Sequence, residues 1–391
     1  MAEDPVQSRP WYLPMRARNA DEEHRAATPL ELFFDLCFVV AVSLAGAGLH
    51  HALTENHVAH GVLGYVMVFF AIWWAWMNFT WFASAYDTDD GLYRLTTMVQ
   101  IVGALVLAAG VPRALDRTDF SVITAGYVIM RLAMVAQWLR AAHADPEHRP
   151  TTLRYAAGVA IVQVGWVARL ALPGAWGIVG FVVLALADVA VPIYAERFSV
   201  TPWHPSHIAE RYGLFTVIVL GESILAATTA MRSALDSGEG GAALLSLAAA
   251  GVVIVFSMWW LYFDRSASDL LTSLRASLVW GYGHLVIFAS AAAVGAGLEV
   301  AIDYDTNATH LSALAAGWAV TVPVALYLLS VWALHIRACA SERGPMVASA
   351  FPVTAVLVLA TPFTHAPVHV TAVLMAGLVL LTQVAGRRAT A

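Results

Sequence analysis

The chain has 391 residues, of which 60% are hydrophobic and 12% charged, and its mean hydropathy is +0.69. Soluble globular domains carry about 25% charged residues, so this composition excludes an ordinary soluble protein and is typical of a polytopic membrane protein. The formal net charge is -6, from 21 basic residues, all arginine, and 27 acidic residues. No basic patch is dense enough to predict nucleic-acid binding.

Residues 1–27 are polar and show no signal-peptide pattern, so we expect a cytoplasmic arm. Twelve apolar runs follow, each long enough or nearly long enough to span a hydrocarbon core of about 30 Å. Because lipid offers the backbone no hydrogen-bond partners, we predict an all-α membrane protein with about twelve transmembrane helices. A short tail, 387–391, ends the chain. The runs cover approximately 30–51, 59–85, 92–112, 119–141, 152–171, 175–195, 208–230, 242–264, 275–298, 310–336, 346–364 and 367–385.

The distribution of arginine predicts the orientation. With both termini in the cytoplasm, 16 arginines fall in inner segments and four in outer loops, while Arg131 lies within the fourth run. An excess of arginine on the cytoplasmic side is the usual orientation signal. We therefore expect cytoplasmic termini, an even number of spans and a location in the cell (plasma) membrane.

The two halves of the sequence resemble each other, which predicts two parallel six-helix repeats, 28–199 and 200–386, as in some transporter folds. The alternative is a chance likeness between apolar helices. The matched positions are Glu31 with Glu210, Trp73–Trp74 with Trp259–Trp260, and Arg94 with Arg275, at offsets of 179, 186 and 181 residues.

Ionisable side chains gather at the inner ends of several runs. Acidic groups in a first turn complement the helix dipole, which accounts for Glu31 and Glu210, but Asp35 lies one turn deeper than Glu31 on the same face. Arg94 and Arg275 are the predicted counter-ions. A salt-bridge set that fixes the bundle and a substrate gate both fit this pattern. The cluster comprises Glu31, Asp35, Asp87, Asp89, Asp90 and Arg94 in the first half, and His207, Glu210, Arg211, Asp264, Arg265, Asp269 and Arg275 in the second.

A few ionisable groups are predicted to lie deeper in the membrane. Glu222 follows Glu210 by 12 residues, about 18 Å along a helix, and Arg131 and Asp188 lie near the middle of their runs. A charge at such depth costs about 2.5 kcal/mol or more, so these three are functional candidates. The alternative is a buried ion pair of Arg131 with Asp188 or Glu222. His284 is expected to be a hydrogen-bonded core histidine.

No metal site is predicted. His207 and Glu210 have the spacing of one half of a di-metal motif in reversed order, but the matching position in the first half is Thr28. Cys37 and Cys339 suggest no disulfide framework, and no cofactor motif is found. Four histidines around a short outer loop could bind zinc or sense pH, although surface positions are favoured; they are His50, His51, His57 and His60.

Aromatic side chains concentrate near the inner ends of the second and eighth runs. Trp and Tyr commonly anchor helices at the interface, and this is the favoured interpretation. The alternative is a pocket for a flat or cationic ligand, with Asn78 as a polar contact. The tryptophans concerned are Trp73, Trp74, Trp76, Trp81, Trp259 and Trp260.

Three segments together resemble the bacterial low temperature requirement A family: 28–42, 73–90 and 207–225. They read TPLELFFDLCFVVAV, WWAWMNFTWFASAYDTDD and HIAERYGLFTVIVLGESIL. The resemblance implies a polytopic membrane protein linked by name to growth in the cold, and it implies no established molecular activity. The positions that match the family's motifs are Glu31, Asp35, Asp87, Arg94, His207, Glu210, Arg211, Gly213, Gly221 and Glu222.

Three functions fit these observations. The first is a transporter-like protein, in which Glu222 and Asp188 carry or sense a proton and Arg131 is the counter-charge. The second is a membrane enzyme acting on a lipid or isoprenoid, with acid and base roles among Glu31, Asp35, Asp87 and Glu210. The third is a non-catalytic sensor or scaffold. The expected partners are the bilayer and a small molecule or ion.

Overall fold

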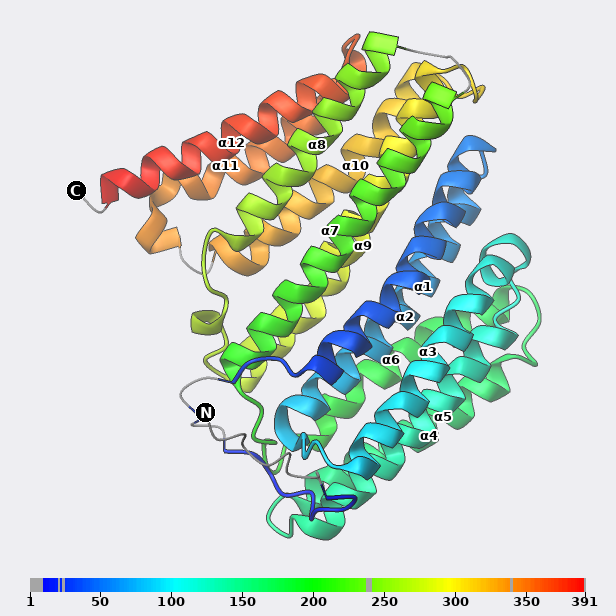
Figure 1. The fold of residues 1–391 in the computed structure, drawn as a ribbon, viewed down its shortest axis with the longest axis vertical. Helices are drawn as coiled ribbons and strands as arrows, with labels where there is room; N and C mark the ends of the chain where they lie inside the picture. Colours follow the sequence, from blue (N-terminus) through cyan, green and yellow to red (C-terminus); the bar gives the residue numbers. More distant parts are fainter. Residues whose placement is uncertain (1–9, 20–21, 23–24, 237–240, 338–339, 390–391) are drawn as a thin grey trace, which may run out of the picture. The chain divides into compact units, whose positions relative to one another are not determined.

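The computed structural model describes residues 10–19, 22, 25–236, 241–337 and 340–389. Its regular secondary structure is helical throughout these ranges, with no strand (Figure 1). The long helices are α1 (Pro29–Thr54), α2 (Val58–Tyr86), α3 (Gly91–Arg117), α4 (Ser121–Ala144), α5 (Arg149–Arg169), α6 (Ala175–Ala195), α7 (Pro205–Asp236), α8 (Gly241–Phe263), α9 (Leu274–Asp305), α10 (Ala313–Val331), α11 (Ala340–Ala360) and α12 (Pro367–Ala389). A π-helical turn, Trp332–Ile336, continues α10, and short 3-10 turns lie at Ser268–Leu270 and Thr361–Phe363.

Eleven helices of the described chain are long and apolar enough to cross a membrane. The remaining long helix, α5, carries Arg149, Arg154 and Arg169, which lower its hydropathy. The predicted class, an all-helical polytopic membrane protein, is confirmed. The internal repeat and the cytoplasmic position of both termini stay predictions.

The chain forms two compact units. The first comprises Met1–Ala41, Phe70–Ala114 and Asp119–Ile208, and the second comprises Val42–Phe69, Leu115–Thr118 and Ala209–Ala391. The chain therefore passes from one unit to the other within α1, α2, α3 and α7. The two units differ in their bounds from the predicted repeats, 28–199 and 200–386, and do not test whether the two halves share one fold.

In the first unit, α4 packs beside α5 and α5 beside α6 (Figure 1). Helices α3 and α4 meet at two glycines, because a Cβ atom added to Gly126 would lie 2.5 Å from the carbonyl oxygen of Gly103. Small residues commonly permit such backbone contact between membrane helices. Three of the four tryptophans of α2 lie inside this unit, Trp73 at 1% exposure and both Trp74 and Trp76 at 0%. Interface anchoring is therefore the wrong interpretation for these three side chains.

The described part of the N-terminal arm packs on the first unit rather than extending from it. Met15 is fully buried, and the backbone N–H of Arg18 donates to the carbonyl of Ala85 at 3.0 Å. Asp90 accepts from the backbone N–H of Leu13 at 2.6 Å and from the guanidinium of Arg140. Burial alone would raise the pKa of Asp90, but these donors and the N–H of Tyr93 outweigh it and hold the pKa below its usual range.

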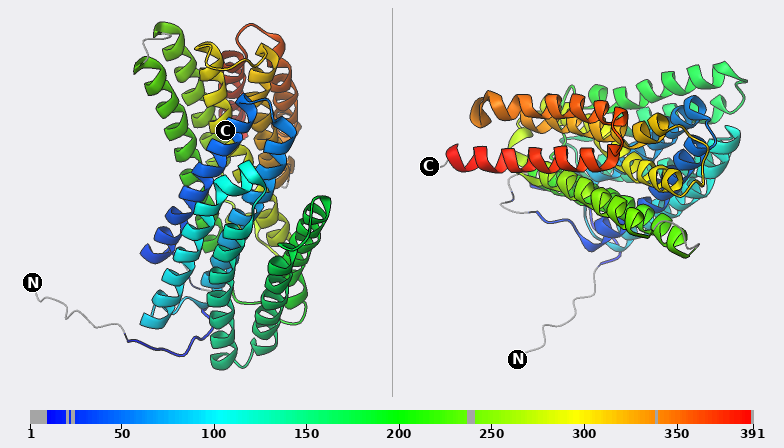
Figure 2. Two further views of the ribbon diagram at one scale, coloured as in Figure 1. Left: turned by 90° about the vertical axis from the view of Figure 1, so that its right-hand side faces the viewer. Right: turned by 90° about the horizontal axis from the view of Figure 1, so that it is seen from above.

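In the second unit, α9 packs along α10, while α8 pairs with α12 and α11 lies beside both α10 and α12. The view from above in Figure 2 shows α11 and α12 side by side. Two glycines let α9 approach its neighbours closely. A Cβ atom on Gly297 would lie 2.2 Å from the carbonyl oxygen of Ala319 in α10, and one on Gly295 would lie 2.9 Å from the Cα of Ser223 in α7.

Replacing Gly297 by alanine is expected to destabilise the protein by about 1–3 kcal/mol, the usual cost of overpacking, because the added methyl group has no space beside Ala319. The matched control is Gly377→Ala in α12, where nothing lies within 4 Å of the added atom. Removing a helical glycine there should stabilise the protein by about 0.5–1 kcal/mol. Unfolding of the purified protein in detergent measures both changes, and equal midpoints for the two variants would contradict the close α9–α10 contact.

Candidate functional site

The second unit contains a cavity of about 190 Å³ bounded by α1, α7 and α9. Small side chains create it: a Cβ atom added to Gly46 would meet nothing within 4 Å, and Ala47, Ala226 and Ala296 line the wall. Its volume gives room for several water molecules. The polar residues on its wall are Ser43, Glu222, Ser223, Thr229 and Glu299.

Two carboxylates face this cavity, Glu222 from α7 and Glu299 from α9. They lie close enough to repel each other electrostatically. Glu222, predicted to be functional from its depth, lies half-buried on the wall of this cavity. Two like charges on one cavity are costly in a membrane protein unless a proton or cation is taken up between them.

A histidine of α1 lies between two acids of α9, and one of these acids, Glu299, is on the cavity wall. His50 of α1 has its Nε2 2.7 Å from Oδ2 of Asp303 and its Nδ1 3.7 Å from Oε2 of Glu299. Glu299 and Asp303 are four residues apart, so they share one face of α9. Of the four loop histidines, His51, His57 and His60 are exposed, and His50 is the one drawn into this arrangement.

Glu299 and Asp303 were not among the residues predicted from the sequence. The ninth predicted run ends at residue 298, whereas α9 continues to Asp305. The available signal was the i, i+4 pair of acids directly after a long apolar run. Within the described chain, no group of three or more His, Cys, Asp or Glu is arranged to hold a metal ion.

Asp188 of α6 lies in the first unit, at 3% exposure, and is held by neighbouring side chains. It accepts from the indole Nε1 of Trp166 at 2.8 Å, and it interacts electrostatically with Arg131. The Arg131 guanidinium also lies 5.0 Å from the centre of the Tyr127 ring. Of the two interpretations of these mid-helix charges, the burial of Asp188 and Arg131 and their electrostatic interaction favour the structural one.

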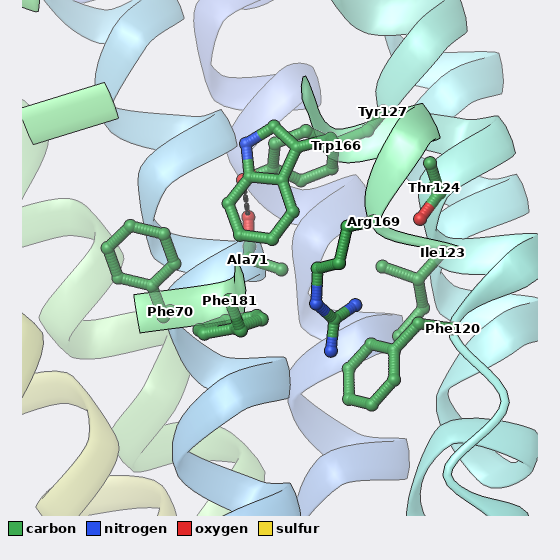
Figure 3. Close-up of a pocket in the computed structure, with 9 residues that line it drawn as sticks. All are labelled: Phe70, Ala71, Phe120, Ile123, Thr124, Tyr127, Trp166, Arg169 and Phe181. Carbon is green, nitrogen blue, oxygen red and sulfur yellow. Dashed lines mark hydrogen bonds between the residues drawn. The ribbon is translucent and has the colours of Figure 1, made fainter. Parts of the chain in front are cut away.

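A small cavity of about 20 Å³ lies near this pairing in the first unit and is dominated by Arg169 (Figure 3). The guanidinium carbon lies 4.9 Å from the ring centre of Phe120, 5.1 Å from Phe181 and 5.9 Å from Trp166. Its Nε donates to the carbonyl of Gly177 at 2.8 Å. Each cation–π contact contributes about 0.5–2 kcal/mol, so this aromatic box holds the protein's own cation.

The inner acids of the first unit are organised around Arg25, which is 4% exposed. Its guanidinium donates to the carbonyls of Ala83, at 2.7 Å, and Ser84. The same group lies 3.6 Å from Glu31 and 3.9 Å from Asp87. A cation supplied by the arm therefore neutralises two buried carboxylates.

Glu31 has further partners at the start of α1. Its carboxylate accepts from the backbone N–H of Thr28 at 2.7 Å, and the Thr28 hydroxyl accepts from the N–H of Glu31 at 3.3 Å. This is a capping box, which fixes the first turn of the helix. Nε2 of His207 lies 3.2 Å from Oε1 of Glu31. His207 of α7 thus contacts a carboxylate of α1. Its predicted partner in the metal-like spacing was Glu210 instead.

The other predicted residues are placed as follows. Asp35 accepts from the indole of Trp76 at 2.6 Å, and Arg94 pairs with Asp89 at 2.7 Å on the surface. The counter-ion of Glu31 and Asp87 is thus Arg25, which the sequence analysis assigned to the arm. Trp81 lies 5.1 Å from Trp203, ring to ring. Glu210 is half-buried, Arg211 is buried and Arg275 is exposed, while Trp259 and Trp260 are 46% and 43% exposed.

His284 of the second unit is the hydrogen-bonded core histidine that the sequence predicts. It is fully buried, its Nε2 lies 2.9 Å from the Tyr262 hydroxyl, and its Nδ1 lies 2.7 Å from the carbonyl oxygen of Trp280. Cys37 is half-buried and free, and Cys339 lies outside the described residues.

Comparison with known proteins agrees with these motifs. The model of the family described as "Bacterial low temperature requirement A protein (LtrA)" matches residues 26–382, nearly the whole chain. A protein of Rhizobium meliloti (strain 1021), named "Uncharacterized protein RA0937", is 27% identical over 314 residues, which cover 76% of this chain and 72% of that protein. The chain belongs to the bacterial low temperature requirement A family.

Proposed function

We propose that this membrane protein is a transporter-like protein in which the cavity between α1, α7 and α9 takes up and releases protons. The observation that carries the proposal is the pair of carboxylates, Glu222 and Glu299, on the wall of one cavity. Intramembrane ionisable residues that face a wet interior typically belong to ion or proton pathways. A lipid-facing or fully paired Glu222 would not support this role.

The other buried acids have neighbours that favour structural roles for them. Asp188 accepts from the Trp166 indole and interacts electrostatically with Arg131, and Glu31 and Asp87 lie beside Arg25. These contacts favour structural roles, and they weaken the alternative of an enzyme that uses Glu31 and Asp87 as free acid and base. The proton-binding role therefore passes to Glu222 and Glu299, with Asp188 removed from the proposed pathway.

The test is proton flux into liposomes that contain the purified protein and an internal pH-sensitive dye, driven by a potassium–valinomycin potential. We expect flux with the wild type and at least a tenfold reduction with Glu222→Gln, because the amide keeps the shape and loses the exchangeable charge. The matched control is Asp236→Asn, an exposed acid on the same helix, which should keep wild-type flux.

Two outcomes would overturn the proposal. One is equal proton flux in Glu222→Gln and wild type. The other is no flux in either protein, although both are folded by their gel-filtration profiles and melting temperatures. Repeating the assay with sodium and potassium gradients and no pH gradient separates proton transfer from general cation leakage. Leakage that Glu222→Gln leaves unchanged would count against the cavity.

A further inference from the structure

We infer that His50 is a proton relay between water at the end of α1 and the Glu222–Glu299 cavity. This inference rests on the proposed function and adds the route by which protons reach the cavity. Its basis is the position of one imidazole between two carboxylates of α9, one of which is on the cavity wall.

Glu299 is less exposed than the two side chains that lead to it. The side chains of Asp303 and His50 are 27% and 26% exposed, and that of Glu299 is 17% exposed. Asp303 is therefore open to water, whereas Glu299 belongs to the cavity wall. Asp303, His50 and Glu299 are thus three neighbouring titratable groups that lead from the surface to the cavity wall.

The imidazole makes contacts of different length on its two sides. The 2.7 Å distance between Nε2 and Asp303 is a hydrogen bond, whereas the 3.7 Å distance between Nδ1 and Glu299 exceeds one. A bridging water or a small rotation of the Glu299 side chain closes the second distance. In the described chain, Glu299 and Asp303 are the titratable groups that interact with His50. The other nearby ionisable groups are Glu222 across the cavity and His51 on α1, which is exposed.

One transfer moves one proton. Protonated Asp303 gives its proton to Nε2, and Nδ1–H gives its proton to the Glu299 carboxylate, so that an O–H and an N–H bond break and an N–H and an O–H bond form. The imidazole is left as its Nε2–H tautomer. It returns to the Nδ1–H tautomer when Nδ1 takes a proton from water and Nε2–H gives one to water, so the number of protons on the ring is unchanged. Glu299 then shares the proton with Glu222, which removes part of the repulsion between the two carboxylates.

The transport test compares His50→Gln with His51→Gln over the pH range 5 to 8 in the liposome assay. Glutamine bonds to both acids but cannot gain or lose a proton there, so His50→Gln should lower flux at least tenfold and flatten its pH profile. His51→Gln changes the adjacent exposed histidine and should keep the wild-type rate and profile. If His50→Gln keeps both while Glu222→Gln abolishes flux, the relay is overturned and the proposed function stands.

A second measurement does not depend on transport. The side-chain NMR signals of isotope-labelled histidine, assigned to His50 by their loss in His50→Gln, follow protonation of this residue in detergent. The relay requires that Glu299→Gln and Asp303→Asn each shift the midpoint of the His50 titration, while Asp236→Asn does not. An unchanged midpoint in Glu299→Gln would overturn the relay even if no protein shows flux.

Discussion

Replacing Arg25 by methionine is expected to destabilise the protein by about 3–5 kcal/mol, the cost of leaving buried charges without their partner. The guanidinium lies between Glu31 and Asp87, and its side chain is 3% exposed, while those of the two acids are 0% and 1% exposed. Methionine keeps most of the volume and removes the charge and the hydrogen bonds to Ala83 and Ser84. Chemical unfolding in mixed micelles, followed by tryptophan fluorescence, gives the change in the free energy of unfolding.

The matched control is Arg18→Met in the same arm. Arg18 pairs with Glu22, and both side chains are 31% exposed, so its loss should cost about 0.2–1 kcal/mol. Arg25→Lys should fall between the two, because one ammonium group cannot reach two carbonyls and two carboxylates in the geometry of a planar fork. If Arg25→Met and Arg18→Met unfold alike, Arg25 is not the counter-ion that holds the inner acids.

The helices were predicted well because lipid requires every backbone N–H and C=O group to be hydrogen-bonded within the segment, so a long apolar run must be helical. The predicted run 59–85 lies within one residue of each end of α2, Val58–Tyr86. An apolar run does not predict the end of a helix that continues into a polar segment. Helix α9 extends to Asp305, seven residues beyond its apolar run, and the two acids missed by the sequence analysis lie in this extension.

Side-chain pairings were predicted less well because packing between segments decides them. Arg94 seemed the natural partner of the inner acids, but the arm folds back and supplies Arg25 instead. The aligned pairs Trp73–Trp74 and Trp259–Trp260 also differ, since the first is buried and the second is about half exposed. Composition and spacing are the same in both pairs, so only the neighbouring helices distinguish a core position from a membrane-facing one.

Arg131→Met is also expected to cost about 3–5 kcal/mol, because it leaves the Asp188 carboxylate buried without its cation. Asp188→Leu should cost a similar amount for the converse reason, since the Arg131 side chain is buried too, at 4% exposure. The double variant should lose clearly less than the sum of the two single losses, because it leaves neither charge unpaired. A coupling energy of about 1.5 kcal/mol or more in the double-mutant cycle would be the sign of the pair.

The control for this cycle is the surface pair of Arg94 and Asp89, where the corresponding changes should cost about 0–1 kcal/mol and add nearly independently. Additive losses at Arg131 and Asp188 would mean that the indole of Trp166 holds Asp188 without help from the arginine. The same variants also separate structure from transport. If Asp188 is part of the scaffold, Asp188→Asn should keep proton flux wherever it stays folded, whereas Glu222→Gln should lose flux while remaining as stable as the wild type.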